Sequence, residues 1–206
     1  MPQQSDNSNP SRTGTVDLSA AQEAIRALLV ALGFDPSEPA LSTTPARASE
    51  AFVEALTRGH DQDPVEALGR GFPTDASGPV IAAGIPLLFV CPHHLMPARG
   101  VAHLGFVPTG RAPGLSRITR MVDVLSRRLV LQEDLTEQLA ATLSEGLDAK
   151  ATIAIVEAQH GCVALEDFAQ RDTRFVTRAE RGDAAIVRSM ADQIGARLKS
   201  CGTSAF

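Results

Sequence analysis

The feature that most constrains this chain's fold is the order of its apolar patterns in the second and third quarters of the sequence. Short runs of branched and apolar residues predict strands, and apolar stripes at helical spacing predict helices. The predicted order is strand, strand, helix, helix, strand, strand, over residues 85–90, 101–107, 118–125, 135–143, 151–158 and 161–165. Strands and helices arranged in this way indicate an α+β fold.

The ends of the chain have a different character from its centre. Residues 1–16 are rich in Ser, Asn, Gln and Pro and predict a disordered tail. Residues 17–71 are expected to form an N-terminal helical section. A stretch rich in Gly, Pro and Ser separates that section from a predicted catalytic domain over 79–206, which ends in a helix capped by Asp183.

The bulk composition excludes several classes of function. The 206 residues carry a formal net charge of -5, which leaves no broad basic surface for nucleic acid. No apolar run approaches the length of a membrane span. Three cysteines and a polar N-terminus predict neither a disulfide framework nor export. We therefore expect a cytoplasmic protein that binds neither nucleic acid nor membrane, with reduced thiols available to a metal.

A cysteine and a histidine three residues apart follow the first predicted strand. The spacing of Cys91 and His94 lets both side chains reach one tetrahedral ion. Cys162, at the start or end of a later predicted strand, is the best candidate for a third ligand. Three protein ligands leave one position open, as in catalytic zinc sites. The alternative is a small buried thiol beside core histidines, and these residues alone leave it open.

Two further histidines stand beside the candidate ligands. His93 and His160 are candidates for general acid and base, because each would lie near whatever a metal-activated water attacks. Packing around the metal is the alternative for either one. His60 and His103 are expected to be structural or solvated.

Four short motifs lie in order along the chain: TPAR at 44–47, CPHH at 91–94, GLSRITRMV at 114–122 and RRLVLQEDLT at 127–136. The corresponding motifs of GTP cyclohydrolase I are T-P-x-R, C-E-H-H, G-L-S-K-x-x-R-[IV]-V and R-R-x-x-x-Q-E-R-L-T. Four ordered motifs at matching separations are far more specific than any one of them. From about residue 18 to residue 182 the chain resembles this family.

The resemblance implies the tunnelling fold. In that fold an antiparallel four-stranded sheet is backed by two helices, here preceded by N-terminal helices and followed by a C-terminal helix. It also implies a homo-oligomer, a homodecamer, with active sites between subunits. The expected small-molecule partner is a purine nucleotide or nucleoside, converted in the case of GTP to dihydroneopterin triphosphate and formate.

The resemblance also implies roles for matching residues. Cys91, His94 and Cys162 would hold Zn²⁺, whose water attacks C8 of guanine. The remaining roles are proton transfer by His160, sugar rearrangement assisted by His93 and Ser116, guanine binding by Gln132 and Glu133, and substrate binding by Arg47, Arg117 and Arg120. Ser116 is equally suited to be the N-cap of the next helix. Glu133 is also placed as a first-turn helix carboxylate.

Two departures from the family pattern bear on the substrate. The family's C-x-x-x-R-G ends here in Glu166 and Asp167. The family arginine would attract the triphosphate, whereas a carboxylate at its position repels it. At an effective dielectric near 20, one such charge pair is worth on the order of a few kcal/mol. Either five arginines between residues 111 and 128 compensate, or the substrate lacks the full triphosphate, which we favour. Pro92 replaces the family glutamate and removes an N–H from the metal loop.

Two other functions remain open at this point. A catalytically silent relative would keep zinc for a structural or regulatory role, but it has no need for the whole set of predicted catalytic residues. A nitrile reductase of the kind found in queuosine synthesis would use a cysteine as a covalent nucleophile. Paired histidines beside Cys91 favour a metal instead.

Overall fold

The computed structural model describes residues 10 and 12–200, with side chains to residue 198. Most of the predicted tail and Cys201 therefore lie outside the described residues. The helices are α1 (Leu18–Ala31), α2 (Thr44–Glu50), α3 (Pro64–Leu68), α4 (Leu115–Ser126), α5 (Gln132–Leu147), α6 (Gly161–Glu166) and α7 (Ala184–Ser200). A π-helical turn (Ala51–Leu56) extends α2, and 3-10 turns lie at Arg58–Asp61 and Phe168–Gln170.

The strands form one four-stranded antiparallel sheet and one short two-stranded ribbon. The larger sheet has the order β2-β3-β5-β6, and the ribbon pairs β1 with β4. Their bounds are β1 (Phe72–Pro73), β2 (Val80–Val90), β3 (Pro97–Val107), β4 (Arg111–Ala112), β5 (Ala151–His160) and β6 (Phe175–Gly182). The predicted tunnelling fold, with its antiparallel sheet and two backing helices, is confirmed.

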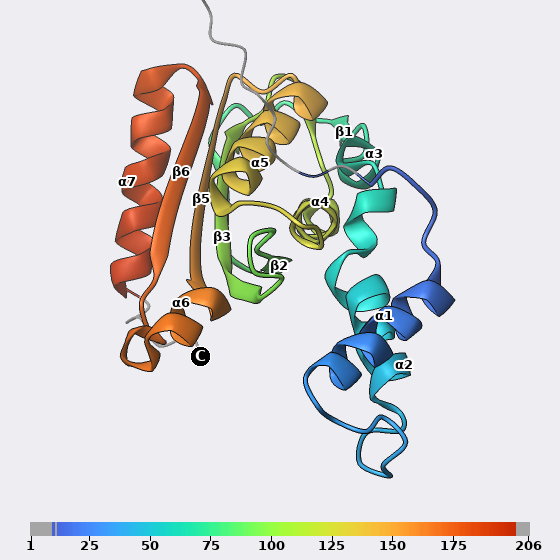
Figure 1. Cartoon of the computed structure of the whole chain (residues 1–206). Coiled ribbons are helices and arrows are strands. Elements are labelled where there is room, and N and C mark those ends of the chain that lie inside the picture. Colours follow the sequence, from blue (N-terminus) through green and yellow to red (C-terminus); the bar gives the residue numbers. More distant parts are fainter. Residues whose placement is uncertain (1–9, 11, 201–206) are drawn as a thin grey trace, which may run out of the picture.

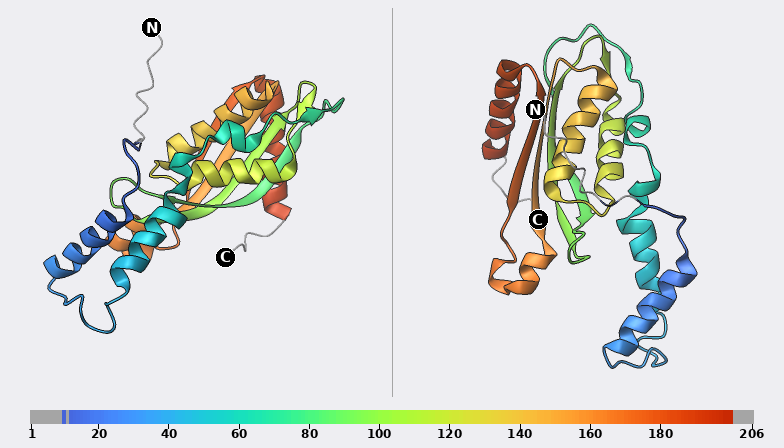
Figure 2. Two further views of the ribbon diagram at one scale, coloured as in Figure 1. Left: turned by 90° about the vertical axis from the view of Figure 1, so that its right-hand side faces the viewer. Right: turned by 45° about the horizontal axis from the view of Figure 1, so that its top comes forward.

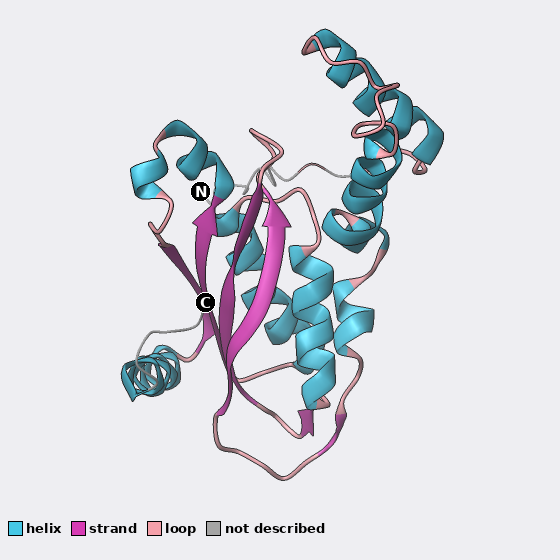
Figure 3. Cartoon of the chain, turned by 90° about the horizontal axis from the view of Figure 1, so that it is seen from below, coloured by secondary structure: helices cyan, strands magenta, loops and turns pink. Residues whose placement is uncertain are grey.

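Helices cover both faces of this sheet (Figures 1 and 3). Helices α4 and α5 pack on one face, where Leu104 of β3 and Val156 of β5 are fully buried in the main core. Helix α7 packs on the other face, against Ile153 and Val107. The alternation of side chains along each strand sends neighbouring residues to opposite cores. Burial of each Leu or Ile contributes about 1.5–3 kcal/mol.

The fourth strand is not where the sequence pattern predicts it. Residues 161–165 form helix α6, and the strand that pairs with β5 is β6, from Phe175 to Gly182. A five-residue apolar run is compatible with either a strand or a helical turn, so periodicity does not decide between them. Most β6 residues are exposed, and a sequence with charges at alternate positions does not show the apolar alternation of a half-buried strand.

The N-terminal helices form an arm that projects from the body of the molecule (Figure 2). Helix α1 has no buried residue, and Leu28 and Leu32 are 53% and 62% exposed. The arm joins the body at Gly59, whose N–H donates to the carbonyl oxygen of Arg127 (2.9 Å). A Cβ at Gly59 would lie 2.1 Å from the carbonyl oxygen of Val124. In the described part of the chain, no helix has the length and apolar character needed to cross a membrane.

We expect Gly59→Ala to lower the free energy of unfolding by about 2–3 kcal/mol, because the methyl group would push α4 away from its contact with the arm. Gly195→Ala is the matched control. Gly195 lies inside α7 with no heavy atom within 4 Å of an added Cβ, so alanine should stabilise by about 0.5–1 kcal/mol. Urea unfolding at one fixed protein concentration measures both. Equal effects of the two substitutions would contradict this account.

Candidate active site

The three predicted metal ligands lie together at one end of the sheet. One donor atom from each of Cys91, His94 and Cys162 lies within 4.8 Å of the others, and Cys91 Sγ is 3.9 Å from His94 Nδ1. Zinc bonds of about 2.1–2.3 Å place tetrahedral ligand atoms roughly 3.5–3.8 Å apart. The three donors lie slightly farther apart than this, and two sulfurs with one imidazole are a donor set that could hold a metal ion such as zinc.

The positions of the ligands follow from the ends of three strands. Cys91 directly follows β2, and its N–H donates to the carbonyl oxygen of Met96 (3.0 Å), which closes the loop that carries His94. Leu95 takes a left-handed backbone conformation (φ 55°) inside that loop. Cys162 lies in the first turn of α6, immediately after β5. Register pairing of Ala98 with His160 brings the two loops together.

The thiol of Cys162 has an environment that disfavours the free thiolate. Burial and the neighbouring Cys91 thiol raise the pKa of Cys162 above its ordinary value. A bound cation reverses such a preference, because metal ligation requires the deprotonated sulfur. Cys162 is thus poorly suited to act as a free nucleophile, and its closeness to Cys91 and His94 suits a cation.

A cavity of about 290 Å³ opens beside the three donors. The segment before α5 reaches the cavity because Val90 and Leu129 form a parallel bridge, in which Val130 N–H donates to the Val90 carbonyl oxygen (3.1 Å). The cavity is lined by Phe89, Cys91, His93, His94, Val130, Leu131, Gln132, Glu133, His160, Cys162, Val163 and Phe175. It contains the metal group, both predicted acid–base histidines and both predicted guanine-binding residues.

Gln132 holds His160 in one orientation and one tautomer. The Gln132 side-chain Nε2 donates to the carbonyl oxygens of Val156 (3.1 Å) and Phe175 (2.9 Å). Its Oε1, 2.8 Å from His160 Nε2, must therefore accept from an Nε2–H group. In that neutral tautomer the lone pair is on Nδ1. Burial lowers the pKa of His160, while Glu133 opposes the shift, so neutral imidazole is favoured near pH 7.

Two aromatic rings fix the His160 ring from its sides. Phe89 and Phe175 each meet it edge to face, with ring centroids 5.5 Å away. Neither phenylalanine was predicted as part of the site. The sequence pattern around Phe89 indicates an ordinary core residue of a strand. Phe175 belongs to β6, and the sequence pattern predicts that strand at residues 161–165 instead.

The other predicted substrate-binding residues do not line this cavity. Arg117 and Arg120 line a separate cavity of about 260 Å³ with Asp61, Asp63 and Glu66. Ser116 is exposed in the first turn of α4, and Arg47 is exposed on α2 in the N-terminal arm. Within one chain, the metal group and these four residues are therefore not parts of one pocket.

The expected N-cap role of Ser116 is wrong. Helix α4 begins at Leu115 with Gly114 as its N-cap, and no side chain caps it. The expectation that Glu133 lies in the first turn of a helix is confirmed. His60 and His103 are structural as expected: His60 Nε2 accepts from the Leu129 N–H (3.0 Å), and His103 is 2% exposed.

Comparisons with known proteins agree with this geometry. A family model described as GTP cyclohydrolase I matches residues 21–195. GTP cyclohydrolase 1 of Corynebacterium glutamicum (strain R) is 39% identical over 168 residues, covering 81% of this chain and 85% of the relative. GTP cyclohydrolase 1 of Streptomyces coelicolor is 38% identical over 171 residues, covering 82% and 85%.

Among solved structures, the archaeosine synthase QueF-Like in the apo form aligns with a TM-score of 0.45 and 17% identity, over 54% of this chain and 99% of its own. The family match and the curated relatives extend over most of the described residues. The chain belongs to the GTP cyclohydrolase I family and is a hydrolase of the type that acts on a cyclic amidine C–N bond.

Proposed function

We propose that the protein hydrolytically opens the imidazole ring of a guanine nucleotide, or of a related purine nucleotide or nucleoside, and releases C8 as formate. With GTP the product would be dihydroneopterin triphosphate. The observation that carries the proposal is one cavity that holds the metal-ligand group together with His160 and Glu133. The reduced thiols it requires are consistent with a cytoplasmic protein.

Cys91, His94 and Cys162 are the residues that would hold zinc. Zinc in a three-ligand site supplies Lewis acidity, which makes water a nucleophile at neutral pH. Two thiolates balance the charge of the ion. The same closeness of Cys91 and Cys162 argues against a covalent cysteine mechanism, since burial and the second thiol raise the pKa of Cys162.

His160 is the residue best placed to move protons as the ring opens. The departing nitrogen must gain a proton when its bond to C8 breaks. A neutral imidazole whose Nε2–H is committed to Gln132 has one basic nitrogen, Nδ1, for taking a proton from water and returning it. Gln132 is 3% exposed and uses its amide inside the protein, so we assign it to positioning His160. His93 is exposed at the cavity and remains a candidate for the later sugar steps.

Glu133 is the candidate for recognition of the guanine edge. It is exposed at the cavity, one residue after buried Gln132. A carboxylate accepts two parallel N–H bonds from N1 and the exocyclic amine of guanine, and adenine lacks that pair of donors. Gln132 and Glu133 are consecutive residues of α5, so the residue that orients His160 stands next to the residue that would bind the guanine edge.

We propose that the working protein is a ring-shaped homo-oligomer, with a homodecamer as the expected state. The body exposes apolar side chains that a second copy would cover, including Leu115 (74%), Leu165 (67%) and Val176 (63%). Strands β2 and β6 are the two edges of the sheet and are open to pairing. In such a ring Ser116, Arg117, Arg120 and Arg47 would reach the metal cavity of a neighbouring subunit.

The test of the proposed reaction is formate release by the zinc-loaded protein from GTP, GMP, guanosine and ATP. We expect turnover of guanine substrates and little turnover of ATP. Formate from none of them, in protein that contains zinc, would support a silent relative and overturn the proposal. If GTP is turned over at least as fast as GMP and guanosine, the argument that Glu166 selects against a triphosphate is wrong.

We expect Cys162→Ser to reduce bound zinc from about one per chain to nearly none, because a serine hydroxyl is a poor replacement for a thiolate ligand. Formate release should fall by at least about a hundredfold. Metal analysis of purified protein checks the first effect. Cys201→Ser is the control and should retain zinc; loss of zinc in that variant would show that the ligand assignment is incorrect.

We expect Glu133→Gln to lower kcat/KM for the guanine substrate by about 10–100-fold, since a charged acceptor of two N–H bonds contributes about 1.5–3 kcal/mol. Zinc content should not change. Glu145→Gln removes a carboxylate from an exposed position near the other end of α5 and should leave kcat/KM within about twofold. Equal kinetic losses in the two variants would contradict a role in base recognition.

A further inference from the structure

A second cavity lies beyond His160, on the other side of the sheet from the metal group. It has a volume of about 360 Å³ and is lined by Leu88, Pro97, Arg99, Gln159, His160, Gly161, Ala164 and Arg171. His160 lines both cavities, so the two are neighbours at the same end of the sheet. This second cavity, like the metal cavity, is not lined by Arg47, Ser116, Arg117 or Arg120.

Strand register places the polar lining of this cavity in one row. Leu88 of β2 pairs with Arg99 of β3, and Arg99 pairs with Gln159 of β5. Directly paired residues in an antiparallel sheet send their side chains to the same face. Arg99 and Gln159 therefore stand side by side on the face opposite Phe89 and Ala98.

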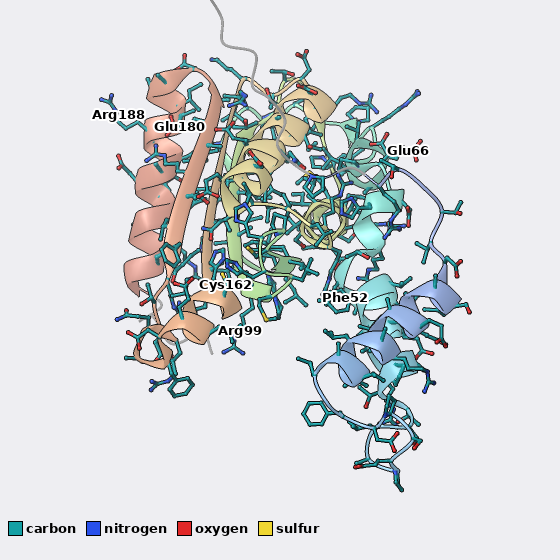
Figure 4. The ribbon with its side chains drawn as sticks, viewed as in Figure 1. Phe52, Glu66, Arg99, Cys162, Glu180 and Arg188 are labelled. Atoms are coloured by element: carbon teal, nitrogen blue, oxygen red, sulfur yellow. The ribbon has the colours of Figure 1, made fainter. Side chains whose placement is uncertain are left out.

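The cavity carries positive charge without a carboxylate in its lining. Arg99 is exposed and has no carboxylate within ion-pair distance among residues 10 and 12–198. Nearby Arg174, by contrast, is paired with Glu157 at 2.7 Å. Figure 4 shows Arg99 near Cys162 at the lower end of the sheet, with Arg188 at the far end of the molecule.

Arg171 is held in place by its own loop. Its guanidinium carbon lies 4.8 Å from the centre of the Phe168 ring, and its Nη1 donates to the Phe168 carbonyl oxygen (3.3 Å). Among the residues that the structure describes, the acid that pairs with it is Asp172, at 3.6 Å and 78% exposed. Such an exposed pair contributes little and competes weakly with a bound anion.

We propose that this second cavity binds a phosphoryl group between Arg99 and Arg171. Guanidinium groups bind phosphate oxygens through paired N–H bonds, and the Gln159 amide adds a neutral donor. The metal cavity has no lysine or arginine among its described lining residues. A nucleotide tail that passes His160, or a separate phosphate-bearing ligand, would present the same chemistry. The nucleotide arm of this proposal rests on the proposed function; the anion site itself does not.

The first experiment measures binding of inorganic phosphate to the zinc-loaded full chain by ³¹P NMR titration. Arg99→Gln and Arg171→Gln should each weaken binding about tenfold, because each removes one charge-assisted contact. Arg188→Gln, which removes one exposed charge from α7, should change affinity by less than about twofold. Asp172→Asn should strengthen binding, since it removes the competing carboxylate. Retained zinc and an unchanged circular dichroism spectrum establish that each variant is folded.

The second experiment identifies the source of the phosphoryl group by comparing GTP with guanosine. If the nucleotide supplies it, Arg99→Gln and Arg171→Gln raise KM for GTP about tenfold and leave KM for guanosine unchanged. If a separate ligand supplies it, phosphate affinity falls in the variants while both KM values stay constant. Phosphate binding that is the same in Arg99→Gln, Arg171→Gln and Arg188→Gln overturns the proposal. The phosphate titration measures binding and not turnover, so it tests the anion site even if the protein releases no formate.

Discussion

The register of β3 against β5 is the constraint on which the active site depends. It pairs Ala98 with His160 and so brings the Cys91 loop, at one end of β3, against the first turn of α6, which carries Cys162. Side chains alternate between the two faces of a sheet, so a slip of one residue would move His160 to the α7 face. The buried faces on both sides oppose such a slip, because every core residue of the strand would change sides with it.

The polar contacts inside the site are built on that register. Buried Gln132, on α5, joins three elements: its amide donates to carbonyl groups of β5 and β6, and its oxygen accepts from His160. A buried amide with all its hydrogen-bonding groups satisfied is stable, whereas one that loses a partner pays a desolvation cost of about 1–3 kcal/mol. The orientation of the proposed proton-transfer group is therefore coupled to the packing of α5 on the sheet.

The charged side chains near the site are divided between two cavities: the carboxylate of Glu133 lines the metal cavity, and the arginines Arg99 and Arg171 line the second cavity. The cavity beside the candidate metal ligands is lined by a carboxylate and by no described lysine or arginine, which suits a purine base and not a polyphosphate. Arg99 and Arg171 lie beyond His160 in a cavity whose described lining has no carboxylate, whereas Arg117 and Arg120 share their cavity with Asp61, Asp63 and Glu66. Glu166 and Asp167, which are exposed and follow Cys162, line none of these three cavities. The phosphate recognition that we propose for this chain thus depends on residues outside the immediate metal pocket.

Local sequence determined the order of strands and helices as far as β5, the residues of the candidate metal group and the cap of α7 by Asp183, because periodicity, ligand spacing and capping act over a few residues. Tertiary structure alone decided what residues 161–165 and 175–182 become, since a short apolar run suits two conformations and an exposed edge strand has no apolar signature. It also decided that Gln132 turns inward to His160 and that Arg99 faces the same cavity as Arg171. Those contacts join residues far apart in the chain, and only packing fixes which of them meet.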